Sequence, residues 1–139
     1  MNLTLHATPE EIMRAVEALQ KYAQSQGVPE KTIFGLSLAL EECGSNIVNH
    51  ALKRDPQKTF QVSIKLAGGT FAIELHDCGP MFDPTAAPTR KPQADADDVP
   101  GGWGIQLVRR HIDEIIYRRV DGENVLRLTK RIMPTPLEK

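Results

Sequence analysis

Two strictly alternating apolar runs constrain the fold of this chain more than any other feature. They consist of Phe60, Val62, Ile64 and Leu66, followed by Phe71, Ile73 and Leu75. A period of two gives each segment one apolar face, as in a β-strand. Gly68-Gly69 separates the runs, so they predict a β-hairpin whose apolar face needs a covering layer.

Two segments with helical spacing can supply that layer. The stretch 8–11 predicts a helix start, in which Thr8 caps the helix and Glu11 completes a capping box. Gly27 fits the end of this helix. A second helix is expected over residues 29–53, because apolar residues recur there every three to four positions.

The remaining elements complete an alternating order. A short strand is expected at residues 3–5, and a helical face follows Gly104. Strands are expected near 115–117 and from 125 to about 132, joined by an Asp121-Gly122 turn. The order strand, helix, helix, strand, strand, helix, strand, strand predicts an α+β fold. Its sheet should be mixed, mostly antiparallel, with the helices on one face.

The domain organisation follows from length and composition. The chain has 139 residues, which suits one domain, expected over residues 1–133 with a loose tail at 134–139. Residues 80–100 are rich in proline, alanine and aspartate and show no periodicity. A stretch of that length inside a compact domain is usually a lid or a disordered link, and we expect a lid because the candidate site elements flank it.

Charge and residue usage exclude several classes of function. The formal net charge is −1, so neither a nucleic-acid surface nor a membrane anchor is expected. The N-terminus lacks the features of a signal peptide, which makes a cytoplasmic location the default expectation. The two cysteines form no metal-binding motif, and the four histidines are scattered.

A polar stripe lies beside the apolar stripe of the second predicted helix. Glu42, Asn46 and His50 are spaced four residues apart, so they share one helix face. The Asn46 carbonyl suits Mg²⁺, which takes oxygen ligands and usually keeps several waters. Glu42 could take a proton from an attacking hydroxyl, and His50 could reach a phosphate. Taken alone, the stripe is more often an ordinary polar helix edge.

Two glycine-containing segments could complete a nucleotide site. Asp77 ends a strand ahead of Gly79, where a carboxylate can accept from the amine of adenine; an Asx turn is the plainer interpretation. The loop 101–104 precedes a helix, where free N–H groups favour anions, although a flexible hinge with a helix cap is equally consistent. It is neither a Walker loop nor a dinucleotide fingerprint. For Trp103, packing over the edge of the core is the plainer interpretation.

These segments resemble a known superfamily as an ordered set. Glu42-x-x-x-Asn46, Asp77-x-Gly79-x-x-Phe82-Asp83-Pro84 and Gly102-x-Gly104 look like the N, G1 and G2 boxes of GHKL ATPases. Within that superfamily, residues 39–50 are similar to the RsbW-like anti-sigma-factor serine kinases. Gly101-Gly102-Trp103-Gly104-Ile105 and Asn124-Val125-Leu126 continue the match, which covers nearly the whole chain.

The resemblance implies a Bergerat α/β sandwich that binds ATP with Mg²⁺. It makes Glu42 the catalytic base and Asn46 the Mg²⁺ ligand, and it makes Asp77 the adenine contact. The nucleotide-binding set it implies is Asn46, His50, Asp77, Gly79, Phe82, Gly101, Gly102, Trp103, Gly104 and Ile105. Relatives phosphorylate a serine on a STAS-domain anti-anti-sigma partner and sequester a sigma factor, commonly as homodimers.

The chain departs from many relatives at two places. Pro100 stands where they carry a basic residue, and Glu123-Asn124 stands where they carry a Gly-Thr pair. The second departure is expected to affect phosphate contacts, and neither departure is expected to change the roles of Asn46 and Asp77. A nucleotide-sensing module that captures a partner without phosphorylating it is the alternative function. Sensor histidine kinases and clamp ATPases are disfavoured by the short chain.

Overall fold

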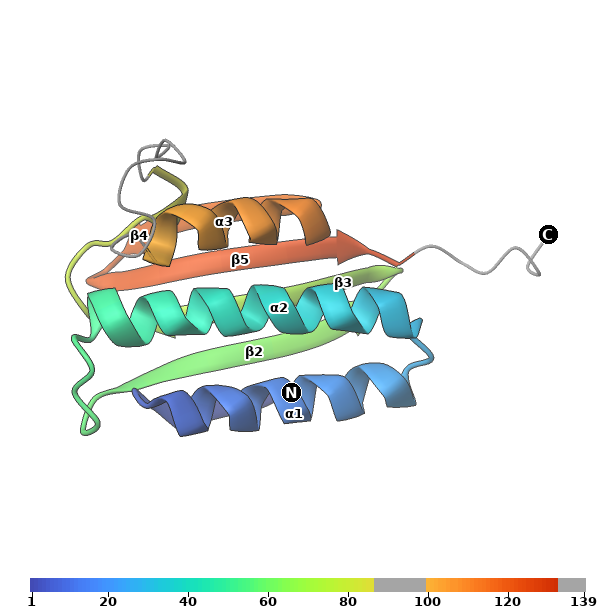
Figure 1. Ribbon diagram of the computed structural model, residues 1–139, viewed down its shortest axis with the longest axis horizontal. Coiled ribbons are helices and arrows are strands. Elements are labelled where there is room, and N and C mark those ends of the chain that lie inside the picture. Colours follow the sequence, from blue (N-terminus) through green and yellow to red (C-terminus); the bar gives the residue numbers. More distant parts are fainter. Residues whose placement is uncertain (87–99, 133–139) are drawn as a thin grey trace.

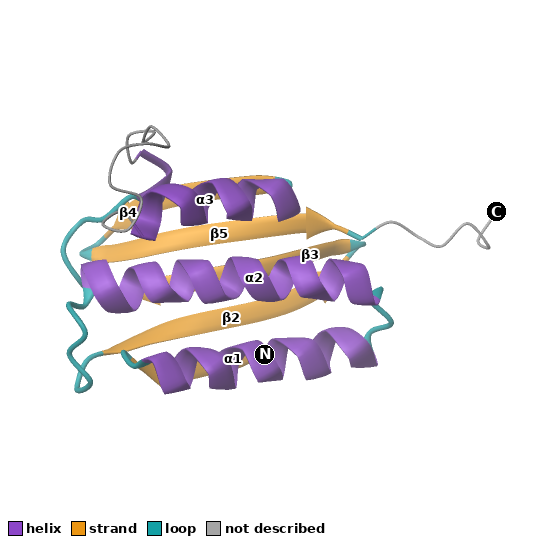
Figure 2. Ribbon diagram, viewed as in Figure 1, coloured by secondary structure: helices purple, strands orange, loops and turns teal. Residues whose placement is uncertain are grey.

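The computed structural model describes residues 1–86 and 100–132, which form a two-layer α/β sandwich. In this part of the chain, helices cover one face of a five-stranded sheet (Figures 1 and 2). The helices are α1 (Pro9–Ser25), α2 (Glu30–Asn46) and α3 (Pro100–His111). The strands are β1 (Asn2–His6), β2 (Thr59–Ala67), β3 (Thr70–Asp77), β4 (Glu114–Val120) and β5 (Glu123–Arg131). The predicted α+β sandwich is confirmed.

The described sheet is antiparallel throughout, where the sequence had indicated a mixed one. Its strand order is β1-β2-β3-β5-β4, and all four neighbouring pairs are antiparallel. Hairpin turns at Gly68-Gly69 and Asp121-Gly122 make two of those pairs, and all four turn residues have positive φ. The β3–β5 pairing sets Asp77 opposite Asn124 at one end of the sheet.

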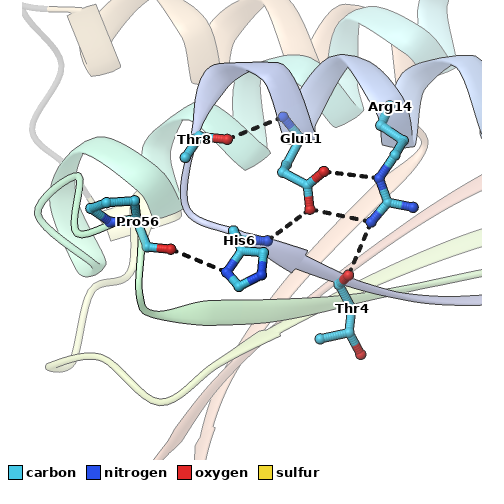
Figure 3. A network of polar contacts seen from close by, with 6 residues as sticks. All are labelled: Thr4, His6, Thr8, Glu11, Arg14 and Pro56. Carbon is cyan, nitrogen blue, oxygen red and sulfur yellow. Dashed lines mark hydrogen bonds and ion pairs between the residues drawn. The ribbon is translucent and has the colours of Figure 1, made fainter.

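The start of α1 is held by a small polar network (Figure 3). As predicted, the Thr8 hydroxyl accepts from the Glu11 N–H, at 3.3 Å. The reciprocal half of the capping box is wrong, because the Thr8 N–H donates to the His6 carbonyl instead. The Glu11 carboxylate accepts from the His6 N–H at 3.0 Å and pairs with Arg14 at 2.9 Å. The network therefore ties α1 to the end of β1.

The core lies between the sheet and the helices. Its largest fully buried side chains include Phe60, Phe71, Leu5, Leu19, Leu36, Leu40, Ile64 and Ile73. Burying each such side chain stabilises the fold by about 1.5–3 kcal/mol, against about 0–1 kcal/mol for an exposed ion pair. Apolar contact between the layers, not surface pairing, therefore holds the two layers together.

The second helix does not continue regularly to residue 53 as predicted. After Asn46 it widens into a π-helical turn, Ile47–Ala51, with a hydrogen bond from the Leu52 N–H to the Ile47 carbonyl at 2.8 Å. The wider turn buries four apolar side chains together, those of Ile47, Val48, Ala51 and Leu52. Such turns occur frequently at functional sites. The chain then leaves the helix through two residues with positive φ, Lys53 and Arg54.

Parts of the earlier expectations fall outside the described residues. Of the predicted lid at 80–100, the structure describes 80–86, which includes a short 3₁₀ turn at Pro84–Ala86, and the start of α3. The tail at 134–139 lies outside, and the boundary of the 1–133 domain stays a prediction. No helix within residues 1–86 and 100–132 is both long and apolar enough to cross a bilayer.

Candidate functional site

The candidate site lies at one end of the sandwich, where α2 and β3 end and α3 and β5 begin (left in Figure 1). Asn46 of α2 and Asp77 of β3 line the same small cavity, together with Phe82 and Pro84 of the segment that follows β3. The cavity measures about 10 Å³, the room needed by roughly one water molecule. A purine base would therefore have to displace some of the side chains that cover it.

Asp77 is a buried carboxylate whose hydrogen bonds all fall on one oxygen. It is 2% exposed, and its Oδ1 accepts from the Gly79 N–H and from the Asn124 amide, both at 2.9 Å. Among the described residues, no cation pairs with Asp77 and no hydrogen bond reaches its Oδ2. A buried charge is costly unless it is well paired, so the second oxygen is suited to a ligand that donates a hydrogen bond.

Gly79 is required by the close approach of two backbone segments. A Cβ at this position would lie 2.5 Å from the Ala51 carbonyl oxygen at the end of the π-helical turn. Any side chain would push that turn away from the end of β3 and disturb the N–H that holds Asp77. Glycine is therefore needed here because there is no room for a side chain, and not because the backbone has a positive φ.

His50 lies in the π-helical turn that begins directly after Asn46. Its imidazole is stacked on Phe82, with ring centroids 5.3 Å apart and an angle of 22° between the planes. The two rings join the π-helical turn to the segment that covers the cavity. A phosphate contact by His50 stays a prediction.

Asn46 and Glu42 keep the predicted relation, one helical turn apart on α2. Asn46 is 7% exposed, and its amide makes no hydrogen bond within the described part of the chain. An amide oxygen left in this way beside a cavity fits a contact to a hard cation such as Mg²⁺. Glu42 is half-buried, and its pKa is raised, first by burial and then by the neighbouring Glu41 charge.

The predicted glycine loop is the beginning of a helix. α3 starts at Pro100, which suits a first helical position, so Gly101, Gly102 and Gly104 are helical. An anion could then bind to the N–H groups of Gly101 and Gly102, because these groups have no partner within the helix. Gly104 is buried against Glu42, whose carboxylate occupies the place of a Cβ. The side chain of Trp103 lies outside the described residues.

Ile105 is 7% exposed and belongs to the main apolar cluster, together with Val108 and Ile112 of the same helix. Phe82 lines the cavity beside Asp77. A nucleotide contact by either residue stays a prediction.

Asn124 is the site residue that sequence reasoning missed. The departure at 123–124 was not expected to affect the role of Asp77, yet it lies next to this residue: Asn124 is 4% exposed and donates directly to the Asp77 carboxylate. Its position follows from strand alternation, because Leu126 and Leu128 face the core and Asn124 has the same parity. The alternation could be seen in the sequence, but the pairing of Asn124 with Asp77 could not.

Sequence comparison finds clear relatives. A model of the histidine kinase-like ATPase domain family matches residues 5–130. The serine/threonine-protein kinase BtrW of Bordetella bronchiseptica is 31% identical over 102 residues, which are 73% of this chain and 72% of BtrW.

Structure comparison finds the same fold. The crystal structure of the SiaB–SiaC complex from Pseudomonas aeruginosa matches with a TM-score of 0.70 at 14% identity, covering 94% of this chain and 88% of that one. The crystal structure of the RsbU and RsbW domains of Rv1364c from Mycobacterium tuberculosis matches with a TM-score of 0.64 at 18% identity. That match covers 95% of this chain but only 31% of the Mycobacterium chain.

Proposed function

The chain belongs to the histidine kinase-like ATPase domain family, and from this membership we propose that it is an ATP-dependent protein serine/threonine kinase of the anti-sigma-factor type. One observation carries the proposal. A buried carboxylate, Asp77, and an amide with no hydrogen-bond partner among the described residues, Asn46, line one cavity at the end of the sandwich where α3 starts. The name of the relative BtrW, a serine/threonine-protein kinase, supports phosphoryl transfer to a protein.

Asp77 provides recognition of the base. A carboxylate with an oxygen turned to a ligand accepts hydrogen bonds and donates none, so it favours the 6-amino group of adenine. Guanine carries a carbonyl oxygen at that position and would be repelled. The apolar side chains of Leu75, Phe82 and Leu126 line the same cavity and suit the faces of a purine.

The phosphates are proposed to lie between α2 and the start of α3. Asn46 would contribute one oxygen to Mg²⁺, which neutralises phosphate charge when bound. The N–H groups of Gly101 and Gly102 would donate to phosphate oxygens at the positive end of α3. Mg²⁺ would not need a cluster of acidic side chains here, since the phosphates and water would supply its remaining ligands.

Glu42 is proposed to act as the base. Its carboxylate takes the proton of a serine hydroxyl as the serine oxygen bonds to the γ-phosphorus and the bond to ADP breaks. Burial raises the pKa of Glu42, which moves it toward the range in which a base is effective near neutral pH. The substrate is proposed to be a STAS-domain anti-anti-sigma protein in the cytoplasm, with a sigma factor and a second copy of the chain as further partners.

Single-turnover phosphate transfer from ATP to a STAS partner tests this assignment. We expect Glu42→Gln to lower the rate by roughly 10²–10⁴-fold, the usual size of a general-base effect, with little change in ATP affinity. Asn46→Ala should lower both affinity and rate. Glu30→Gln is the matched control, because Glu30 is an exposed glutamate at the other end of the same helix.

Two results would contradict the proposal in different ways. Wild-type transfer rates in Glu42→Gln would remove Glu42 as the base and leave the kinase intact. A wild-type protein that binds ATP and captures a partner, but transfers no phosphate, would favour the nucleotide-dependent binding module instead.

A further inference from the structure

Asn124 has the most polar contacts of any side chain around the cavity. Its amide nitrogen donates to Asp77 Oδ1 and to the Pro80 carbonyl, both at 2.9 Å. Its amide oxygen accepts from the Phe82 N–H at 3.2 Å, from Arg119 at 3.1 Å and from the Tyr117 hydroxyl. The two donors and both lone pairs of the amide are therefore in use within the protein.

This network fixes the orientation of the amide. Turning it over would set the amide oxygen against two acceptors, the Asp77 carboxylate and the Pro80 carbonyl. It would also set the NH₂ group against two groups that can only donate, the Phe82 N–H and the Arg119 guanidinium. Asn124 consequently has no hydrogen-bonding capacity left for a ligand and can influence one only through its neighbours.

We infer that Asn124 is a positioning residue for base recognition, which acts on the 6-amino group of the base only through Asp77. By holding Oδ1 it leaves Oδ2 as the acceptor for the 6-amino group, and by holding Pro80 and Phe82 it fixes the segment that covers the cavity. The inference rests on the proposed function, because it assumes that an adenine nucleotide occupies this site.

Arg119 extends the network to the edge of the sheet. It lies exposed on β4, and its guanidinium donates to the Gly79 carbonyl at 2.7 Å as well as to Asn124. The Gly79 N–H is the other donor to Asp77 Oδ1. Both groups that hold the carboxylate are thus themselves held by one side chain from the outermost strand.

A thermodynamic cycle tests the inference. Calorimetry with Mg²⁺ would measure the affinities of ATP and of purine riboside triphosphate, which lacks only the 6-amino group. We expect the wild type to prefer ATP by about tenfold or more, the value of one hydrogen bond to a charged group. In Asn124→Leu, which keeps the volume and removes the amide, the two ligands should bind about equally. The effects on affinity of substituting Asn124 and of removing the 6-amino group are then non-additive, as expected for groups that act through one contact.

Further variants control for misfolding and for the loss of a buried hydrogen bond elsewhere in the protein. Asn124→Ala removes the same donor without adding bulk, and Asn124→Thr retains one hydroxyl, so the cycle can be measured even where leucine is not tolerated. Ser37→Ala is the matched control, because it removes a buried hydroxyl that bonds to the Ile33 carbonyl in α2. It should leave the preference for ATP unchanged.

Each outcome decides a different question. If the Asn124 variants lose affinity for both ligands equally and keep the preference for ATP, Asn124 is merely structural and the inference is overturned, while the proposed function stands. If the wild type binds neither triphosphate, the proposed function fails and the inference falls with it. If the wild type binds both equally, Asp77 does not detect the amine, and the inference is overturned for that reason.

Discussion

At the scale of single residues, two glycines set how α2 and α3 approach each other. The helices pack antiparallel, with Gly35 of α2 against His111 and Gly104 of α3 against Glu42. We predict that Gly104→Ala lowers phosphate transfer by about tenfold or more, since small misplacements of a reacting group can cost up to about 10²-fold. ATP affinity should change little, because the Gly104 N–H lies beyond the free first turn of α3. Single-turnover transfer and calorimetry on the same variant separate the two quantities.

The exposed position Gln106 on the same helix supplies the control. Gln106→Ala should leave both transfer and affinity unchanged. If Gly104→Ala instead weakens ATP binding and leaves transfer at saturating ATP unchanged, Gly104 contacts a phosphate, as the resemblance implied. It then does not position Glu42.

At the scale of elements, the joint between β1 and α1 should make stability depend on pH. The Arg14 guanidinium, followed by the His6 N–H, lowers the pKa of Glu11 to about 2. A lowered carboxyl pKa adds stability above the unfolded value of about 4.5, and this stability is lost as pH falls from there toward 2. Because the pair is largely solvated, we expect Glu11→Gln to lower the unfolding free energy at pH 7 by only about 1 kcal/mol. Urea unfolding across pH 2–7 measures the difference.

Glu10→Gln provides the matched control for this joint. Glu10 lies in the same first turn, so Glu10→Gln changes the interaction with the helix dipole as much as Glu11→Gln does. Glu10 is exposed, however. An equal loss of stability in both variants would mean that the dipole, and not the network with His6 and Arg14, explains the effect.

At the scale of the whole molecule, the candidate site joins the two layers. Asn46 comes from the helical layer and Asp77 from the sheet, so a ligand between them resists separation of the layers. We predict that ATP with Mg²⁺ at about 100 times its dissociation constant stabilises the fold by about 2.7 kcal/mol and raises Tm by several degrees. In Asp77→Asn the shift should be much smaller at the same ATP concentration, because an amide donor would face the adenine amine.

Asp121→Asn makes the same chemical change in an exposed hairpin turn, where asparagine tolerates the positive φ. Its Tm should respond to ATP as the wild type does. An equal response in Asp77→Asn would place the base elsewhere in the molecule.

The local pattern of the sequence determined the elements and much of the candidate site. Alternation from Phe60 to Leu75 predicted the hairpin and placed Asp77 at the end of its second strand, because side-chain period and turn chemistry are short-range properties. Helical spacing likewise placed Glu42 and Asn46 on one face of α2.

Only the tertiary structure decided which of these groups meet. The register of β3 against β5 brings Asn124 to Asp77, although 47 positions separate them in the sequence. The helix widens after Asn46, where four apolar side chains are buried together, and His50 stacks on Phe82. Residues 101–104 belong to α3, whose Ile105 is buried in the core. Each of these outcomes depends on contacts between distant segments, whose free energy no local pattern contains.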